Sequence, residues 1–213
     1  MKTSISKFLL FLISLLLVLS ISLLLVVPKA ILLDKLLSER GIHLLAGRVD
    51  EGVADVSFEK LRVFYGGEEV LDLDRAVLSF SPAGLKAEGR CGSGRAYLRL
   101  GWGKTLEIKL RDFACSPFFR SASAKLLVSE GLHGKLKISG LRVRGVEIDS
   151  VSMSFKGETF DGSISYMGMT LSGGGRFRLR RSIGRSPVDA IFKGKMGTLL
   201  VKGTLSNISV QLK

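Results

Sequence analysis

The sequence predicts a mainly β protein, in which a single N-terminal transmembrane helix is followed by a curved antiparallel β-meander. Three observations support this fold class. Residues 8–27 form an uncharged run in which 17 of the 20 residues are apolar. From residue 42 onward, apolar and polar residues alternate with a period of two, as in strands with one dry and one wet face. Glycine-rich turn signals separate these alternating runs at short intervals.

The first predicted element is a membrane anchor that runs from Phe8 through Leu16 to Val27. At about 1.5 Å per residue, a helix of this length covers roughly 30 Å, which is the thickness of the hydrocarbon core of a bilayer. A cleaved signal peptide has a shorter apolar core and a small-residue cleavage site, and a buried helix of a soluble protein usually has a polar face. Neither pattern fits residues 8–27 as well as an uncleaved signal anchor does.

The short basic tail of residues 1–7 is expected to stay in the cytoplasm, although the basic residues on the two sides of the anchor are nearly balanced. This orientation predicts a single-pass protein of the bacterial inner membrane with residues 42–213 in the periplasm. Between them, residues 28–41 predict a short amphipathic helix with Gly41 as its stop signal. That helix either extends the anchor, lies at the membrane interface or caps the sheet.

Residues 42–213 are expected to form ten or more strands. Residues 121–130 fit either a short helix or a strand. A flat sheet of this length is improbable because strands twist, so the meander should curl into an open trough, a sandwich or a partial barrel. The expected turns lie at Gly66-Gly67, Ser81-Pro82, Gly92-Ser93-Gly94, Gly101, Gly140, Gly157, Gly168, Gly173-Gly174-Gly175 and Gly203.

If the sheet is an open trough, its apolar face is available to acyl chains. A sealed sandwich would instead bury the same side chains against one another, and the sequence leaves both alternatives open. The apolar positions with the clearest alternation are Leu106, Ile108, Leu110, Val151, Met153 and Phe155.

The chain is strongly basic, with a formal net charge of +13, and the excess is greatest from residue 176 to the end. For a membrane-anchored chain, the expected partners of such a region are anionic phospholipid headgroups; the alternative is a solvated face that keeps the domain soluble. Nucleic acid is not an expected partner, because the few aromatic residues form no stacking platform among the cations. The candidate headgroup contacts are Arg176, Arg178, Arg180, Arg181 and Arg185.

Two cysteines, Cys91 and Cys115, allow one disulfide. One strand is expected between them, which would separate them by roughly 9–10 Å, whereas the Cα atoms of a disulfide are rarely more than about 7 Å apart. The bond therefore requires the Cys115-Ser116-Pro117 loop to fold inward, and the sequence leaves the redox state open.

No motif of an enzyme or of a cofactor site is recognisable. His43 and His133 lie far apart within strand-like runs, and no cysteine or acid adds metal-ligand spacing to either. Asp72 and Asp74 are expected on the wet face of a strand. Residues 173–175 lack the Gly-Lys-Ser/Thr ending of a phosphate-binding loop. The sequence therefore predicts a non-catalytic protein without a cofactor or a metal.

The segment Gly131–Leu141, with the sequence Gly-Leu-His-Gly-Lys-Leu-Lys-Ile-Ser-Gly-Leu, is echoed by Met196–Gly203 near the C-terminus. With the proline-terminated anchor, it resembles the strand-and-turn repeat of the type II secretion system protein N family. This resemblance implies an accessory inner-membrane component whose periplasmic β-domain binds other secretion proteins. AsmA-like and other bridge-like lipid-transfer proteins carry a similar repeat, which implies periplasmic lipid binding or transport as the alternative.

Overall fold

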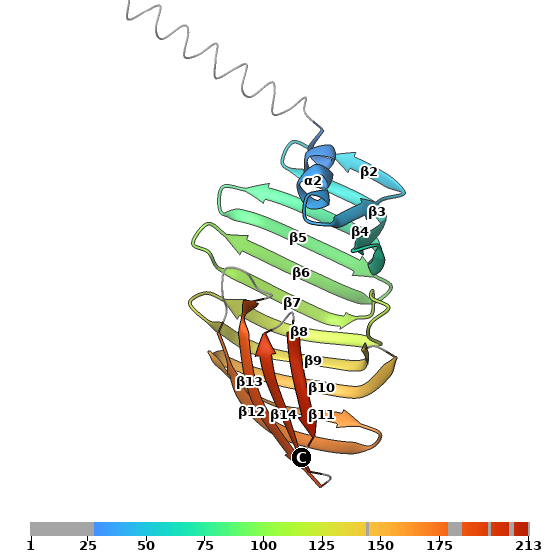
Figure 1. Cartoon of the computed structure of the whole chain (residues 1–213). Helices are drawn as coiled ribbons and strands as arrows, with labels where there is room; N and C mark the ends of the chain where they lie inside the picture. The colour runs from blue at the N-terminus through green and yellow to red at the C-terminus, as the bar shows by residue number, and fades with distance from the viewer. Residues whose placement is uncertain (1–27, 144, 179–184, 196, 205–206, 213) are drawn as a thin grey trace, which may run out of the picture.

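The computed structural model describes residues 28–143, 145–178, 185–195, 197–204 and 207–212. Within these ranges the chain forms one helix and a single 15-stranded antiparallel sheet (Figure 1). The elements are α2 (Lys29–Ser38), β1 (Ile42–Leu45), β2 (Arg48–Glu51), β3 (Asp55–Tyr65), β4 (Glu68–Ser81), β5 (Gly84–Cys91), β6 (Gly94–Gly101), β7 (Leu106–Phe113), β8 (Ser121–Val128), β9 (Leu132–Val143), β10 (Val146–Gly157), β11 (Thr159–Tyr166), β12 (Met169–Phe177), β13 (Pro187–Gly194), β14 (Gly197–Thr204) and β15 (Asn207–Leu212).

From β3 to β15 each strand pairs with the next strand of the chain, while β1 and β2 share the outer edge of β3. Pairing between the two ends of this order is not found in the described residues, so the sheet is open rather than closed into a barrel. The predicted mainly β, antiparallel meander is confirmed. Among the described residues no helix is long and apolar enough to cross a membrane. The predicted anchor, with Phe8, Leu16 and Val27, lies outside the described residues.

The sheet is elongated and curled. Its strands stack one after another away from α2, and β12–β14 turn across the strands before them at the far end (Figure 1). Right-handed strand twist makes such curling the expected behaviour of a long sheet. The curl gives the sheet an inner face and an outer face, and α2 lies at the N-terminal end.

Apolar residues occupy the inner face because the side-chain period of a strand is two and the register is continuous. One inner row runs across five strands as successive Cα partners: Ala96, Leu110, Ala124, Leu136 and Met153. The outer row next to it contains Tyr97, Lys109, Lys125, Lys135 and Ser154. All apolar positions that the alternation placed on one face therefore do share a face.

Two local expectations are settled by this register. The ambiguous stretch 121–130 contains strand β8, whose Ala122 and Ala124 are buried on the inner face. The prediction of a turn at residues 173–175 is wrong, because these glycines lie within β12. A Cβ atom on Gly173 would collide with the carbonyl oxygen of Ile191, so the glycines permit close backbone approach instead. The turns predicted at Gly140 and Gly203 are also wrong, because these glycines lie within β9 and β14.

Candidate functional site

The inner face of the N-terminal half lines an open apolar cavity of about 440 Å³. Its floor comes from β3–β7, and Leu33 and Leu37 of α2, with Leu44 of β1, line its N-terminal end. Among the described residues that line it, Glu88 is the only charged one. Further lining residues are Phe58 and Leu61 of β3, Leu73 and Ala76 of β4, Ala87 and Gly89 of β5, Ala96 and Leu98 of β6, and Ile108, Leu110 and Phe113 of β7.

Helix α2 is held over this cavity at its first turn. The carboxylate of Glu51, at the end of β2, accepts hydrogen bonds from the backbone N–H groups of Lys29 (2.8 Å) and Ala30 (3.0 Å). These two bonds hold the pKa of Glu51 below its ordinary value. The Lys29 ammonium also donates to the carbonyl of Gly52 (2.9 Å). The start of α2 is therefore fixed to the edge of the sheet, and its carboxylate partner suits the positive end of the helix dipole.

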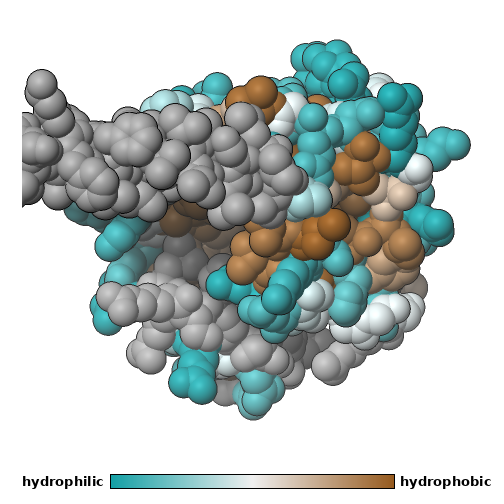
Figure 2. Space-filling model, turned by 90° about the horizontal axis from the view of Figure 1, so that it is seen from above, coloured by the Kyte–Doolittle hydropathy of each residue, from teal (hydrophilic) through white to brown (hydrophobic). Residues whose placement is uncertain are grey.

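The opposite side of α2 is also apolar, and it is exposed. Ile31, Leu32 and Leu36 keep 66%, 50% and 63% of their surface accessible. The region from β1 to the β2–β3 turn, beside the helix, exposes further apolar residues, namely Leu45, Val49 and Val53. From above, this end of the molecule shows a hydrophobic patch bordered by hydrophilic residues (Figure 2). An amphipathic surface helix normally turns mainly polar residues to water, whereas α2 exposes three apolar side chains beside Asp34 and Lys35.

The side of the trough is also apolar at its rim. Phe80 of β4 and Leu100 of β6 belong to the inner face and remain 45% and 47% exposed. Trp102 follows in the β6–β7 turn, where its indole N–H donates to the carbonyl of Pro82 (2.6 Å) and the side chain is 77% exposed. A sealed sandwich would cover such residues, so in its N-terminal half the sheet is an open trough.

The C-terminal half of the inner face is sealed by its own side chains. Phe160, Phe177, Ala190 and Phe192 are buried there, and Phe192 keeps only 2% of its surface exposed. Neighbouring rings lie 5.7–6.5 Å apart in tilted or edge-on arrangements. Residues from β9 to β14 pack around this group. We call it the phenylalanine cluster.

The six predicted trough residues consequently divide between two environments. Ile108 and Leu110 line the open cavity, and Leu106, on the same strand, lies across from Leu100 near the rim. Met153 and Phe155 of β10 pack against the phenylalanine cluster. The third residue of that strand, Val151, is half-buried between its strand partners Ile138 and Ile164. The trough and the sealed interior that the sequence left as alternatives both exist, at different ends of one sheet.

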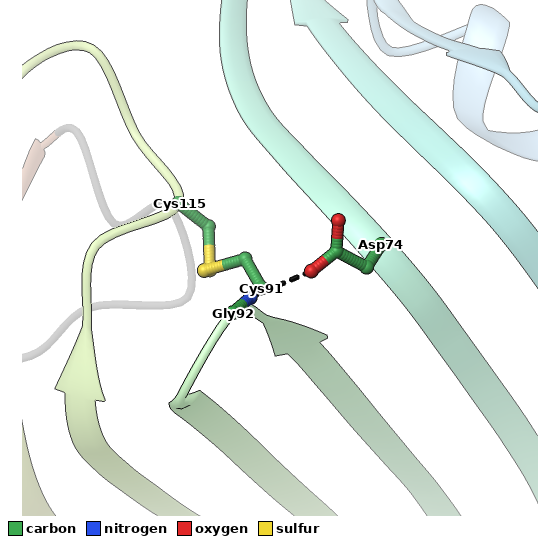
Figure 3. The surroundings of a disulfide bond; sticks show 4 residues. All are labelled: Asp74, Cys91, Gly92 and Cys115. Carbon is green, nitrogen blue, oxygen red and sulfur yellow. Dashed lines mark hydrogen bonds between the residues drawn. A yellow bond between two sulfur atoms is a disulfide. The ribbon is translucent and has the colours of Figure 1, made fainter.

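Cys91 and Cys115 form a disulfide with a Cα–Cα distance of 5.7 Å (Figure 3). The chain beyond β7 folds back over the β5–β6 turn, and the carbonyl of Cys115 accepts a hydrogen bond from the backbone N–H of Asp72 on β4 (2.8 Å). Gly94 permits this crossing, because a Cβ atom there would lie 2.7 Å from the carbonyl oxygen of Asp112. Asp74 accepts a 2.6 Å hydrogen bond from the N–H of Gly92 in the same turn.

The outer face of β4–β7 carries a row of arginines that pattern reading missed. Arg75, Arg90, Arg95 and Arg111 are successive cross-strand partners, and all four are exposed. We call this row the arginine ladder. In the described part of the chain, no ion pair joins any of the four to a carboxylate. The sequence indicates part of this row, because Arg90 and Arg95 lie at equal distances on either side of the Gly92-Ser93 turn and therefore become strand partners.

In the basic C-terminal region, which begins at residue 176, acidic side chains lie next to two of the candidate arginines. Arg176 lies on the outer face with Asp189 as its cross-strand partner, and Lys202 follows on the other side of that acid. The guanidinium of Arg178 pairs with Glu158 at 2.9 Å. Arg185 is exposed, whereas Arg180 and Arg181 lie outside the described residues. Of the described candidate arginines, Arg176 is the one that the strand register places on the outer face, behind the inner face that lines the cavity.

The remaining polar candidates are not assembled into a site. His43 and His133 are exposed strand residues on β1 and β9. Across the described ranges, no group of three or more His, Cys, Asp or Glu side chains could hold a metal ion. A shallow depression of about 740 Å³ on β7–β11 is lined by Lys125, Lys135 and Lys137 with several serines and Asp161.

The chain is 34% identical over 187 residues to an uncharacterized protein of Aquifex aeolicus (strain VF5), and the alignment covers 87% of this chain and 85% of that protein. No protein-family model matches the chain, and no solved structure matches it significantly.

Proposed function

The chain belongs to the same family as this uncharacterized Aquifex aeolicus protein, and we propose that its trough binds the acyl chain of a lipid. The observation that carries the proposal is the apolar cavity between α2 and β3–β7. Its volume of about 440 Å³ lies within the range of roughly 300–1,000 Å³ that is typical of ligand pockets. Its walls offer almost exclusively aliphatic and aromatic groups, which favour an equally apolar ligand.

The distribution of charge supports an acyl chain rather than a whole lipid as the enclosed part. A buried phosphate or carboxylate would need hydrogen-bond donors or a cation, because burying an unpaired charge is costly. The described lining offers no cation, and its one charged residue, Glu88, alternates to the outer face with its strand partner Tyr97. The headgroup therefore stays at the open rim, and the cavity selects for a hydrocarbon chain rather than for a particular headgroup.

The sealed C-terminal half limits what the trough can hold. The phenylalanine cluster occupies the inner face where a continuous groove would have to run. An acyl chain that enters from the open half ends against this cluster. A non-catalytic lipid-binding cup of this kind fits the alternative that the sequence implies, periplasmic lipid handling, although it is closed at one end.

The proposal includes the location predicted from the sequence, a single-pass inner-membrane protein with residues 42–213 in the periplasm. The disulfide between Cys91 and Cys115 supports an oxidising compartment. An alkaline phosphatase fused to the C-terminus should be active, since that enzyme needs an oxidising compartment. A green fluorescent protein fused there and exported through the general secretory route should stay dark. The opposite pair of results would place the domain in the cytoplasm.

The accessory role in type II secretion stays a prediction from the resemblance of Gly131–Leu141. Most of β9 comes from this segment. Recovery of inner-membrane secretion subunits with the tagged chain in mild detergent would support that role. Acyl-chain binding does not depend on the result.

The lipid proposal is tested with the full chain in mild detergent and cis-parinaric acid, a fatty acid that fluoresces in apolar surroundings. The variant Ala87→Phe places a ring in the cavity, because Ala87 lines its floor. The control Lys86→Phe adds the same ring one residue away, on the outer face. We expect Ala87→Phe to weaken binding at least tenfold and Lys86→Phe to leave it unchanged. Absence of binding by the unmodified chain, or equal binding by both variants, would refute the proposal.

A further inference from the structure

We propose that α2 and the neighbouring β1–β2 tip insert into the headgroup–acyl boundary of the bilayer, so that the N-terminal end of the trough opens onto the membrane. This inference rests on the proposed acyl-chain trough and adds the surface from which the chain enters. The occupant of the exposed apolar patch is thus lipid rather than another protein.

The two faces of α2 carry the argument. At 100° per residue, Ala30, Leu33 and Leu37 fall on one side of the helix and pack toward the cavity and the core. Leu32 and Leu36 fall on the other side, and Ile31 lies between the two sides, near Lys35 and Ser38; all three apolar residues are half exposed or more. A helix that is apolar on both sides is normally buried on both sides. In the described structure only one side is covered.

The length and position of the preceding chain identify what covers the other side. The uncharged run of 20 residues ends at Val27, and α2 begins at Lys29 with Pro28 as its N-cap. If the run spans the hydrocarbon core, the first turn of α2 begins within one or two residues of the bilayer surface. An apolar helix face at that depth meets acyl chains and headgroups, as in interfacial helices.

The charges around the patch are mixed. Cations such as Lys35 and Arg48 alternate with acids such as Asp34 and Asp50, and Arg48 is already paired with Asp50 at 3.1 Å. Electrostatic attraction to anionic lipid is therefore weak at this end, and the contact depends on apolar burial. It differs in this respect from docking by the arginine ladder, which would be salt-sensitive and specific for anionic lipid.

Docking through α2 also fixes the orientation of the sheet relative to the bilayer. The Glu51 carboxylate ties the helix to β2, and the strands stack away from α2 along the long axis (Figure 1). The cavity that Leu33 and Leu37 line is then the part of the trough nearest the bilayer. An acyl chain passes from the membrane beneath α2 into the cavity, and the headgroup stays at the interface.

The test places one spin label at a time on the full chain reconstituted in phosphatidylcholine vesicles. The native cysteines are joined to each other, so an added cysteine is the one that the label modifies. The variant Leu36→Cys reports on the exposed side of α2, and Lys86→Cys on the outer face of β5 gives the aqueous reference. We expect the label at position 36 to be accessible to oxygen and protected from a water-soluble nickel chelate. The label at position 86 should show the reverse.

A second variant separates this inference from the lipid-binding proposal. Leu32→Asp should slow the transfer of cis-parinaric acid from vesicles to the protein at least fivefold, while the fatty acid presented in detergent binds as before. Unchanged transfer, or a label at position 36 in the aqueous phase, would overturn the docking surface and leave the trough intact. Loss of binding in detergent as well would show instead that Leu32→Asp damages the trough.

Discussion

Phe192 is the residue whose truncation should most clearly reveal the sealed half of the sheet. Its side chain is 2% exposed, and its ring centroid lies 6.5 Å from that of Phe160. An aromatic side chain buries about 150–250 Å², and at about 25 cal/mol per Å² the lower value corresponds to about 4 kcal/mol. The cross-strand partner of Phe192 is Gly173, which has no side chain that could move into the cavity left by Phe192→Ala. This agrees with the roughly 3–5 kcal/mol that Phe→Ala changes cost in cores.

The measurement is urea unfolding of the full chain in mild detergent, followed by far-ultraviolet circular dichroism. With a slope of about 2–3 kcal/mol per molar urea, Phe192→Ala should lower the midpoint by roughly 1.3–2 M. Phe80→Ala removes the same group from the rim, where the ring is 45% exposed, and by the same area argument should cost about 2 kcal/mol, half as much. If both variants lost the same stability, or if Phe192→Ala cost less than about 1 kcal/mol, the phenylalanine cluster would not be a packed core.

Three further outcomes follow from the described contacts. Arg95→Glu in the middle of the arginine ladder should raise the free energy of unfolding by about 1 kcal/mol at low salt, because two repulsive cross-strand pairs, with Arg90 and Arg111, become attractive. This gain should shrink in 1 M salt, and thermal unfolding at both salt concentrations checks it. Replacing Cys91 and Cys115 together with serine should cost about 3 kcal/mol in urea unfolding, since their 24-residue separation limits the unfolded chain, and an unchanged midpoint would contradict this. The folded-state pKa of Glu51 is lowered, so its contribution to holding α2 is present above the ordinary carboxyl pKa and is lost as pH falls through the lowered one. Hydrogen exchange should show the first turn of α2 losing protection over that acidic range, and Glu51→Gln should show the loss at neutral pH as well.

The periodicity of the sequence was enough to predict the strands and their shared apolar face. Leu106, Ile108 and Leu110 lie on the inner face of one strand, as the period of two requires. The same reasoning failed at residues 173–175. Three successive glycines are typical of a turn, whereas here they allow the backbones of β12 and β13 to approach closely. This close approach depends on the position of β13, which the sequence of residues 173–175 alone does not indicate.

The candidate site was harder to predict, because it depends on how the sheet curls. Ile108 and Met153 have similar sequence surroundings, yet one lines an open cavity and the other packs against buried rings. Alternation determines the face of a side chain but not what lies opposite that face. The disulfide shows the same limit, since the separation expected from strand spacing was overcome by a chain crossing above Gly94.

The order of strands in the sheet has a consequence for how the chain reaches its folded state. From β3 onward each strand pairs with the strand made just before it, so strand pairing does not wait for distant segments of the chain, and a low contact order favours rapid folding. Each new hairpin adds to an existing edge, and stability grows by nearest-neighbour increments, as it does in repeat proteins. The domain is therefore suited to folding from its N-terminus while later segments are still arriving. The crosslink between Cys91 and Cys115 encloses only β6 and β7, so it closes as soon as β7 has paired and does not wait for the C-terminal strands.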